Sequence, residues 1–451
     1  MAREKTHFIC QSCGTIEPRW LGRCPGCGSW GSLVEERQAA GDSERRASAG
    51  EPPRAQPITA IAGGAEHRLV SGIAELDRVL GGGLVPGSVV LVGGDPGIGK
   101  STLLLQCSGA LSRAGHGVLY VAGEESAQQT RLRGERLGVL VEPLLVLAEA
   151  CLEDILPTVK SAAPACLVID SIQTVYSSKL ESAPGSISQL REVAAQLITW
   201  ARRFGMPIVL IGHVTKDGAI AGPKVLEHMV DTVLYFEADS GHACRILRAV
   251  KNRHGSTNEI GVFEMGAAGL IEVENPSQLF LAERAEGAPG SAVTASLEGS
   301  RPLLVELQGL VTTSGLANPR RMATGVDAAR LSLIVAILEK RGGLHLHGCD
   351  IFANVAGGAR LSEPAADLGI AAVLASSFLD RPIAPGTVVF GELGLAGEVR
   401  SVSQVEARLK EAAKLGFHRA LVPQASSIAE QAARGLEIIR LRSVVELLGV
   451  L

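Results

Sequence analysis

The chain has 451 residues, its formal net charge is −4, and aromatic residues make up only 3% of it. This charge excludes a uniformly basic nucleic-acid-binding protein, so any contact with DNA has to come from local patches. The sequence has no run of 18 apolar residues and no signal peptide, which predicts a cytoplasmic protein that does not bind a membrane. The length predicts two or three domains.

The N-terminal segment, residues 1–34, carries four cysteines in two Cys-x2-Cys-Gly pairs. Two such turns facing each other offer four thiolates, and a tetrahedral set of sulfur ligands suits Zn²⁺. Two disulfides are the alternative, which a reducing compartment disfavours. A segment this small would depend on the metal for its folding free energy. The sequence therefore predicts a C4 zinc ribbon, with the ligands Cys10, Cys13, Cys24 and Cys27.

Two tryptophans, Trp20 and Trp30, flank these cysteine pairs. We interpret them as a cover over the metal site, and a stacking surface for DNA or protein is the alternative. Residues 35–57 are charged, small and proline-bearing, which predicts a flexible linker. The remaining cysteines lie in apolar stretches and are expected to be buried thiols: Cys107, Cys151, Cys166, Cys244 and Cys349.

Residues 88–112 predict a strand, a phosphate-binding loop and a helix. A mostly apolar strand candidate, 89–93, is followed by Gly94-x4-Gly99-Lys100-Ser101 and an apolar-periodic helix. The glycines let backbone N–H groups point at phosphate oxygens, and the helix N-terminus adds partial positive charge. The Lys100 amine would reach the β- and γ-phosphates of ATP, and the Ser101 hydroxyl would bind Mg²⁺. The expected nucleotide-binding residues are Gly94, Asp95, Pro96, Gly97, Ile98, Gly99, Lys100, Ser101 and Thr102.

Strand candidates alternate with helix patterns through residues 58–285, which predicts an α/β ATPase domain with a mostly parallel, doubly wound sheet. The late strands look like an added antiparallel hairpin. Ligands bind beyond the carboxyl ends of parallel strands. There Asp170 would orient Mg²⁺, either Glu124 or Glu125 would polarise the attacking water, and His213 is either a γ-phosphate sensor or a structural histidine. We assign the water-polarising role to Glu124.

Several longer segments together resemble the bacterial RadA/Sms family of RecA-superfamily DNA repair ATPases. They are the four cysteines, RLVSGIAELDRVLGGGLVPGS at 68–88, GGDPGIGKSTL, GEES at 123–126, IDSIQT at 169–174, SAPGSISQLRE at 182–192, GHVTKDG at 212–218 and KNRHG at 251–255. The resemblance implies a RecA-like core and a homo-hexameric ring. It also implies DNA-stimulated ATP hydrolysis with ATP, Mg²⁺ and Zn²⁺, and helicase-like branch migration on single-stranded and branched DNA beside a RecA-type recombinase.

The KNRHG segment has His254 where the family pattern has phenylalanine. Lys251 and Arg253 lie two apart on a strand candidate and therefore share one face. This arrangement suits two cations that enter the next subunit's γ-phosphate site, as an arginine finger does and as in the similar Lys-x-Arg pair of the DnaB helicase. A solvated basic strand end is the alternative.

Two loops, residues 176–187 and 214–227, are rich in glycine, serine and proline and are our candidates for DNA contact. Lys179, Lys216 and Lys224 would contact phosphates there, and ordinary surface lysines are the alternative. In a ring of six subunits, each of these lysines would occur six times around one DNA strand.

Residues 290–451 predict a compact α+β domain that resembles the proteolytic domain of Lon proteases. Lon-type proteolysis needs a serine nucleophile and a lysine base, and these positions hold Asp367 and Glu406. We therefore expect no peptidase activity, but a ring-forming surface. A basic DNA platform of Arg400, Arg408, Lys410 and Lys414 is a further possibility, and a solvated helix face is its alternative.

Two other functions compete with the DNA-dependent motor. An ATP-dependent peptidase of the Lon class is disfavoured by Asp367 and Glu406. A non-enzymatic ATP switch of the same superfamily is disfavoured by the cysteine pairs and by the Lys251 and Arg253 pair.

Overall fold

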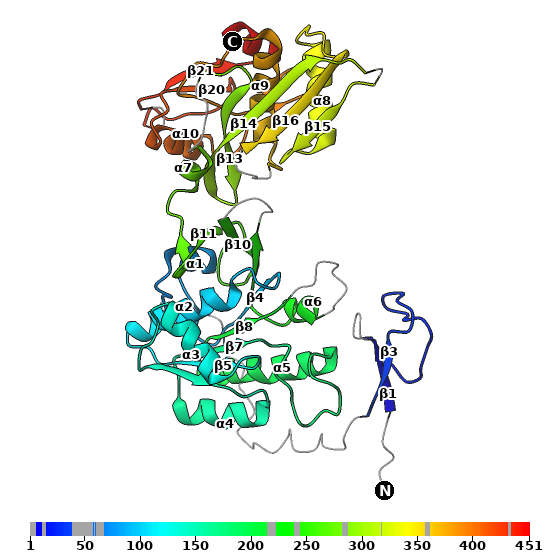
Figure 1. Ribbon diagram of the computed structural model, residues 1–451, viewed down its shortest axis with the longest axis vertical. Helices are drawn as coiled ribbons and strands as arrows, with labels where there is room; N and C mark the ends of the chain where they lie inside the picture. Colours follow the sequence, from blue (N-terminus) through cyan, green and yellow to red (C-terminus); the bar gives the residue numbers. More distant parts are fainter. Residues whose placement is uncertain are drawn as a thin grey trace. The chain divides into compact units, whose positions relative to one another are not determined.

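The computed structural model describes residues 6–10, 15–37, 57, 59, 67–213, 222–238, 244–281, 287–316, 318–356, 361–431 and 434–451. The chain divides into two compact units, the second of which comprises residues 273–451 (Figure 1). We had expected the ATPase domain to extend to residue 285. Helix α7 (Pro276–Leu281), however, packs on strand β14 (Arg301–Thr313) of the second unit.

The N-terminal ribbon is a small antiparallel sheet of β1 (Thr6–Cys10), β2 (Ile16–Glu17) and β3 (Leu33–Arg37), in the order β2-β1-β3. Its core consists of Cys10, Cys24 and Leu33. Strand β3 continues three residues into the segment expected to be a linker, because it pairs with β1 as far as Arg37. Residues 38–56 of that linker lie outside the described residues.

The ATPase core is a nine-stranded sheet in the order β12-β11-β10-β9-β4-β8-β7-β5-β6. Strands β4 to β9 pair in parallel, and β9 to β12 pair antiparallel, so the expected parallel sheet with an antiparallel extension is confirmed. Strands β6 and β12 were not expected from the sequence. The strands are β4 (Val89–Gly94), β5 (Val118–Ala122), β6 (Leu144–Leu147), β7 (Cys166–Asp170), β8 (Ile208–Ile211), β9 (Thr232–Ala238), β10 (Cys244–Asn252), β11 (Ile260–Gly266) and β12 (Gly269–Glu272).

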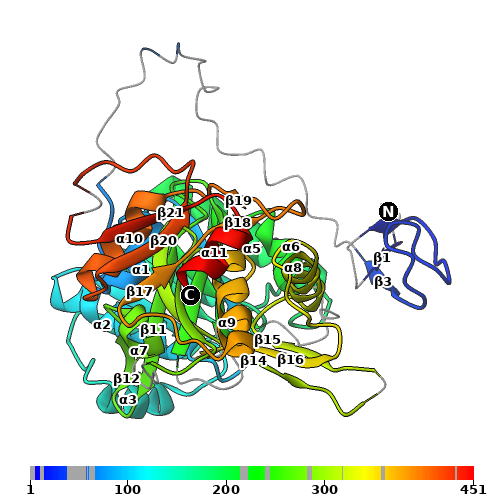
Figure 2. The same ribbon diagram turned by 90° about the horizontal axis from the view of Figure 1, so that it is seen from above.

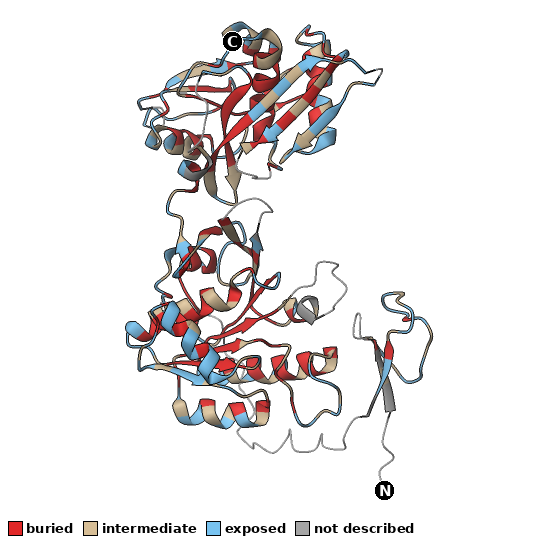
Figure 3. Ribbon diagram, in the orientation of Figure 1, coloured by how far each residue is buried: buried red, intermediate tan, exposed pale blue. Residues whose placement is uncertain are grey.

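The strands of this sheet consist mostly of buried residues (Figure 3). Their apolar side chains form two separate cores. Alternate residues of a strand face opposite sides, so Val90 packs in the core with α2 while Val89 packs in the core with α4 and α5. The helices are α1 (Ala74–Leu80), α2 (Lys100–Arg113), α3 (Ala127–Arg136), α4 (Leu152–Ala162), α5 (Ile187–Phe204) and α6 (Gly222–Glu227). All five scattered cysteines are buried, as expected.

Apolar residues at helical spacing through 188–204, with Phe204 on the same face, predict a helix, and helix α5 confirms it. Ser186 caps its N-terminus by accepting a hydrogen bond from the Gln189 amide, and Gly205 ends it in the left-handed conformation with φ 63°. One expectation was wrong at its end: Phe204 is 49% exposed rather than part of the buried face, because it lies in the last turn.

The second unit is a mixed seven-stranded sheet in the order β15-β16-β14-β13-β17-β20-β21. Helices α8 and α9 pack against β14, β15 and β16 (Figure 2). The alternation of strand and helix patterns in this part of the sequence predicts a strand at 361–367, but a 3-10 turn at Pro364–Ala366 leads directly into α9. The further elements are β13 (Ser291–Glu298), β15 (Arg321–Thr324), β16 (Cys349–Val355), β17 (Thr387–Val389), β18 (Glu392–Leu393), β19 (Val399–Arg400), β20 (Arg419–Pro423), β21 (Glu437–Leu441), α8 (Ala328–Lys340), α9 (Asp367–Leu379), α10 (Val405–Lys414) and α11 (Val444–Val450). In the described part of the chain, no helix combines the length and apolar character needed to cross a bilayer.

Candidate nucleotide-binding site

The glycine loop joins the end of β4 to the start of α2, as its sequence predicted. Gly94 has φ 144°, and a Cβ atom at this position would lie 2.4 Å from the carbonyl oxygen of Phe236 on the neighbouring strand. Only glycine therefore allows the loop to leave the sheet here. Ser101 and Thr102 follow at the first turn of α2, where free backbone N–H groups favour an anion.

The Lys100 side chain is folded back over this loop. Its Nζ atom donates hydrogen bonds to the carbonyl oxygens of Gly94 at 2.7 Å and Asp95 at 2.8 Å, and the residue is only 3% exposed. Burial lowers the pKa of Lys100 to about 8, and the negative charge of Asp170 opposes that shift. The Lys100 side chain is therefore held at the loop, and a bound phosphate group would stabilise its protonated form.

Asp170 ends β7, one strand removed from β4, with β8 between them. Its Oδ2 atom accepts a hydrogen bond of 2.5 Å from the hydroxyl of Tyr120 on β5. Burial raises the pKa of Tyr120 well above its ordinary value, so the phenol stays protonated and acts as the donor. The sequence analysis missed this tyrosine, although it is the one polar-tipped residue in the otherwise apolar strand 118–122.

The structure distinguishes the two consecutive glutamates after β5. Glu124 accepts a hydrogen bond from the Ser171 hydroxyl and lies 3.4 Å from Nε2 of His213. Glu125 instead forms an ion pair with Arg133 of α3. The carboxyl ends of β5, β7 and β8 thus bring together Glu124, Ser171 and His213, and Ser171 is a residue that the sequence analysis missed.

His213 lies two residues after the end of β8 and is the last described residue before the gap that begins at residue 214. Among the described residues, neither of its buried ring nitrogens has a hydrogen-bond partner, and Glu124 approaches Nε2 only at ion-pair distance. The carbonyl oxygen of His213 accepts a hydrogen bond of 3.2 Å from Nε2 of Gln173. His213 therefore lies beside the Glu124 carboxylate, as a group that senses the γ-phosphate would.

Lys251 and Arg253 lie near the end of β10, where a bulge separates Ala249 from Lys251. The Lys251 Nζ atom donates hydrogen bonds of 2.7 Å to the carbonyl oxygens of Glu227 and Val230, just after α6. Arg253 pairs with Asp231 at 3.2 Å. Both cations therefore contact the same short segment of their own chain, residues 227–231.

The segment 177–186, most of the first candidate DNA loop, is held by side chains from two helices. Gln189 of α5 is 1% exposed and donates hydrogen bonds to backbone carbonyls of this loop, including Ser182 at 2.9 Å. Glu153 of α4 accepts from the Ser177 hydroxyl at 2.6 Å. Lys179 is exposed on the loop. Lys216 and the side chain of Lys224, on the second candidate loop, lie outside the described residues.

The ribbon brings three of the four expected zinc ligands together. The Sγ atoms of Cys10, Cys24 and Cys27 all lie within 4.8 Å of one another, and Cys13 lies outside the described residues. This cluster fits a metal that prefers sulfur ligands. Trp20 and Trp30 do not cover it as we expected, because they are 58% and 77% exposed.

In the second unit, the two positions that we expected to match the Ser and Lys of Lon proteases, Asp367 and Glu406, both carry carboxylates with hydrogen-bond partners. Asp367 is 2% exposed and binds the Arg330 guanidinium through two hydrogen bonds, and the Leu393 amide also donates to it at 3.2 Å. Glu406 accepts a hydrogen bond of 3.1 Å from the Ala429 amide.

The expected basic platform of this unit is wrong in one member. Arg408 is 0% exposed and pairs with Glu363, because its position on α10 faces the core beside Leu409. Lys410 and Lys414 are exposed on the same helix, and Arg400 is paired with Glu398.

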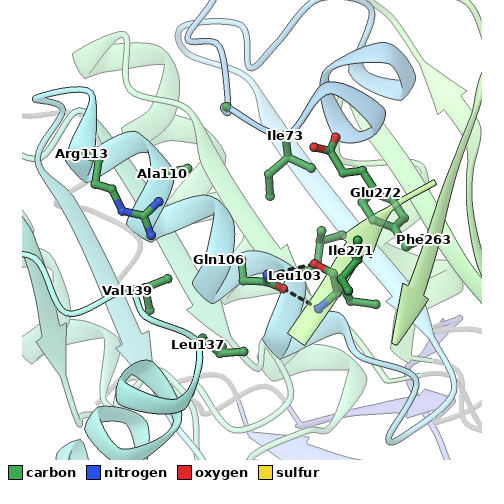
Figure 4. Close-up of a pocket in the computed structure, with 12 residues that line it drawn as sticks. Ile73, Leu103, Gln106, Ala110, Arg113, Leu137, Val139, Phe263, Ile271 and Glu272 are labelled. Atoms are coloured by element: carbon green, nitrogen blue, oxygen red, sulfur yellow. Dashed lines mark hydrogen bonds between the residues drawn. The ribbon is translucent and has the colours of Figure 1, made fainter. Parts of the chain in front are cut away.

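A separate pocket of about 320 Å³ lies along α2, on residues to which the sequence assigned no role in nucleotide binding (Figure 4). Gln106, which lines it, exchanges hydrogen bonds of 3.0 and 2.9 Å with the backbone of Leu270. No loop glycine, and neither Lys100 nor Asp170, lines this pocket, so it is distinct from the candidate nucleotide site.

Comparisons with known proteins agree with this arrangement. Residues 62–219 match the family described as AAA domain, residues 8–35 the rubredoxin metal binding domain, and residues 327–426 the subunit ChlI of Mg-chelatase. These matches and the two sheets confirm the expected fold class, an α/β RecA-like P-loop core with an N-terminal zinc ribbon and a C-terminal α+β Lon protease-like domain.

Among solved structures, a KaiC-like protein from Pyrococcus horikoshii is 25% identical, with a TM-score of 0.40, over 46% of this chain and 100% of its own. Over the full length, the chain is 53% identical to "DNA repair protein RadA" of Bacillus subtilis, covering 99% of both chains. It is also 53% identical to the protein of that name from Halalkalibacterium halodurans, over 100% of this chain and 99% of the relative. A phosphate-binding loop, a carboxylate-lined sheet edge and a cysteine ribbon thus occur in a chain that belongs to the bacterial DNA repair protein RadA family.

Proposed function

We propose that the protein is a DNA-dependent ATPase of recombinational repair that acts as a ring on single-stranded and branched DNA. The observation that carries this proposal is the meeting of Lys100, Asp170 and Glu124 at the carboxyl edge of one parallel sheet. Asp170 ends a strand at this edge, Glu124 follows another strand there, and Lys100 begins the helix after the glycine loop. Phosphates bind at this edge in open α/β sheets. The family membership supports DNA repair as the setting.

Each residue has a distinct role in the proposed hydrolysis. The backbone of residues 94–102 and the Lys100 ammonium bind the phosphates, and Ser101 and Asp170 hold Mg²⁺, which neutralises the charge that develops on the γ-phosphate. Glu124 orients the attacking water, and His213 senses the phosphate beside it. Glu125 has no direct role, because Arg133 already neutralises it.

Lys251 and Arg253 would act on the nucleotide of the neighbouring subunit. Their present partners are two carbonyl oxygens after α6 and the carboxylate of Asp231. Hydrogen bonds to carbonyl oxygens are weaker than those to a phosphate anion, so a neighbouring triphosphate would compete well for Lys251. Arg253 would exchange the carboxylate of Asp231 for a phosphate group of that nucleotide.

A mixing experiment tests the proposed division of each site between two subunits. Lys100→Ala and Lys251→Ala should each abolish ATP hydrolysis. A mixed ring, however, contains interfaces that pair the intact loop of one variant with the intact Lys251 of the other. Random assortment in a head-to-tail ring makes about a quarter of the interfaces complete, so hydrolysis should return to about that fraction of wild type. A mixture as inactive as its components would refute the proposal, as would a wild-type rate that single-stranded DNA leaves unchanged.

We also propose that the second unit is not a peptidase. A carboxylate such as Asp367, held by Arg330, cannot act as the serine nucleophile, and Glu406 cannot replace the lysine base. ATP-dependent release of labelled peptides from casein by the purified protein would contradict this.

A further inference from the structure

The zinc ribbon presents two large aromatic rings to solvent. Trp20 and Trp30 are 58% and 77% exposed, although each would gain free energy by burial. Among the described residues, the third tryptophan, Trp200, packs instead with its ring centroid 4.7 Å from that of Phe204. Two exposed tryptophans on so small a domain indicate a contact surface rather than an incidental exposure.

The two rings approach each other across Gly22. A methyl group added at Gly22 would lie 3.7 Å from an atom of the Trp30 ring and 3.8 Å from an atom of the Trp20 ring. Gly22 does not have the positive φ that would require glycine, unlike Gly28 and Gly31 nearby. A Cβ atom would make only ordinary van der Waals contacts with both rings, so it takes a larger side chain at this position to fill the space between them.

The turn that carries the metal ligands fixes the position of this surface. Arg23 and Trp30 form an antiparallel bridge, and the Gly31 amide donates a hydrogen bond of 2.8 Å to the Gly22 carbonyl oxygen. The Cys24 amide donates to the Ser29 carbonyl oxygen at 2.9 Å between them. A rigid platform of this kind loses little conformational entropy when it binds a ligand.

One arginine lies near the Trp30 ring, and a second adjoins Trp20 in the chain. The Arg23 guanidinium carbon lies 6.0 Å from the centroid of the Trp30 ring, and its Nε atom is held by the Gly28 carbonyl oxygen at 3.0 Å. Arg19 is exposed directly beside Trp20 in the chain. Aromatic rings for bases together with cations for phosphates are the combination that binds single-stranded nucleic acid. An apolar peptide would need the rings but not the cations.

We propose that Arg19, Trp20, Gly22, Arg23 and Trp30 form a stacking surface for bases of single-stranded DNA, distinct from the loops of the ATPase core. This inference deepens the proposed function, because it adds a second contact for the same class of ligand. The bases stack on the exposed rings, and the two arginines contact the flanking phosphates. Binding here requires the folded ribbon but neither ATP nor Lys100.

The experiment uses the full chain with its zinc and the Trp200→Phe substitution, so that all tryptophan fluorescence comes from the ribbon. An oligothymidylate added without nucleotide should quench this fluorescence. Trp30→Ala and Gly22→Leu should each weaken oligothymidylate binding on the order of tenfold, the first by removing a ring and the second by filling the space between the rings. Trp30→Phe should retain most of the affinity.

The zinc content of each variant shows whether the ribbon is folded, so a loss of binding with full zinc content is a loss of the surface. Unchanged affinity and no quenching in zinc-loaded variants would overturn the inference. So would quenching by a RecA-type recombinase but not by the oligonucleotide, which would identify a protein-binding surface. Neither result would affect DNA-stimulated hydrolysis by the core, which the mixing experiment tests separately.

Discussion

Arg408 provides the sharpest test of how the second unit is built. The residue is 0% exposed, and its guanidinium donates hydrogen bonds to the carbonyl oxygens of Ala295 at 2.5 Å and Ser403 at 3.0 Å and to the carboxylate of Glu363. Arg408→Ala would remove all of these donors. The carboxylate of Glu363 would then lack its counter-charge in a site where only 20% of its side chain is exposed.

The expected cost follows from these contacts. Removing one partner of a buried ion pair costs about 3–5 kcal/mol. The carboxylate of Glu363 would keep the Leu297 amide at 2.7 Å as a donor, which lowers the cost, while two backbone carbonyl oxygens would lose theirs, which raises it. We therefore expect Arg408→Ala to lower the free energy of unfolding of this unit by about 4 kcal/mol.

Urea unfolding followed by hydrogen exchange in peptides from β13 and α10 measures this loss in the second unit alone. Lys410→Ala is the matched control, since Lys410 is exposed on the same helix, and its effect should stay within about 0.5 kcal/mol. Combining Arg408→Met with Glu363→Leu should recover at least half of the loss, because no unpaired charge remains. If Arg408→Ala weakened DNA binding while leaving the unfolding free energy within about 1 kcal/mol of wild type, our structural assignment would be wrong.

Three further predictions concern the ATPase core. Burial lowers the pKa of Lys100 to about 8, so ATP affinity measured by calorimetry should fall about tenfold per pH unit above that value as the amine loses its proton, whereas Lys100→Arg should show no such fall. Glu124→Gln should reduce steady-state ATP turnover by about a hundredfold or more, and Glu125→Gln by no more than about fivefold, since it only breaks a partly exposed ion pair. Equal effects of the two would refute the separation of their roles. Gln189→Ala should speed amide exchange in residues 177–182 and weaken single-stranded DNA binding, because the loop loses the side chain that orders it. Exchange that stays at the wild-type rate would show that other contacts hold the loop.

Local signals in the sequence were sufficient for the nucleotide site. The strand, glycine loop and helix at 89–113 are adjacent in the chain, and each is specified by its own residues. Asp170 could be located because it follows a short apolar run directly. Such features depend on periodicity and on backbone conformation within a few residues, which a sequence displays.

The unexpected strand β6 shows where local signals fail. It is an edge strand whose residues 145 and 146 are exposed, so it lacks the continuous burial of its neighbours. Similarly, the exposure of Trp20 and Trp30 depends on how the short ribbon folds, and their proximity to cysteines in the sequence did not indicate it.

The sequence by itself determined the order of the elements, the phosphate-binding loop and the cysteine pairs, because each is set by neighbouring residues. Only the tertiary structure decided that Arg408 is buried on Glu363, that Glu124 rather than Glu125 meets Ser171 and His213, and that Lys251 reaches the carbonyl oxygens after α6. These contacts join residues between 21 and 89 positions apart in the chain. A charged side chain looks the same in the sequence whether it is solvated or paired, and only the partners brought to it by folding determine which it is.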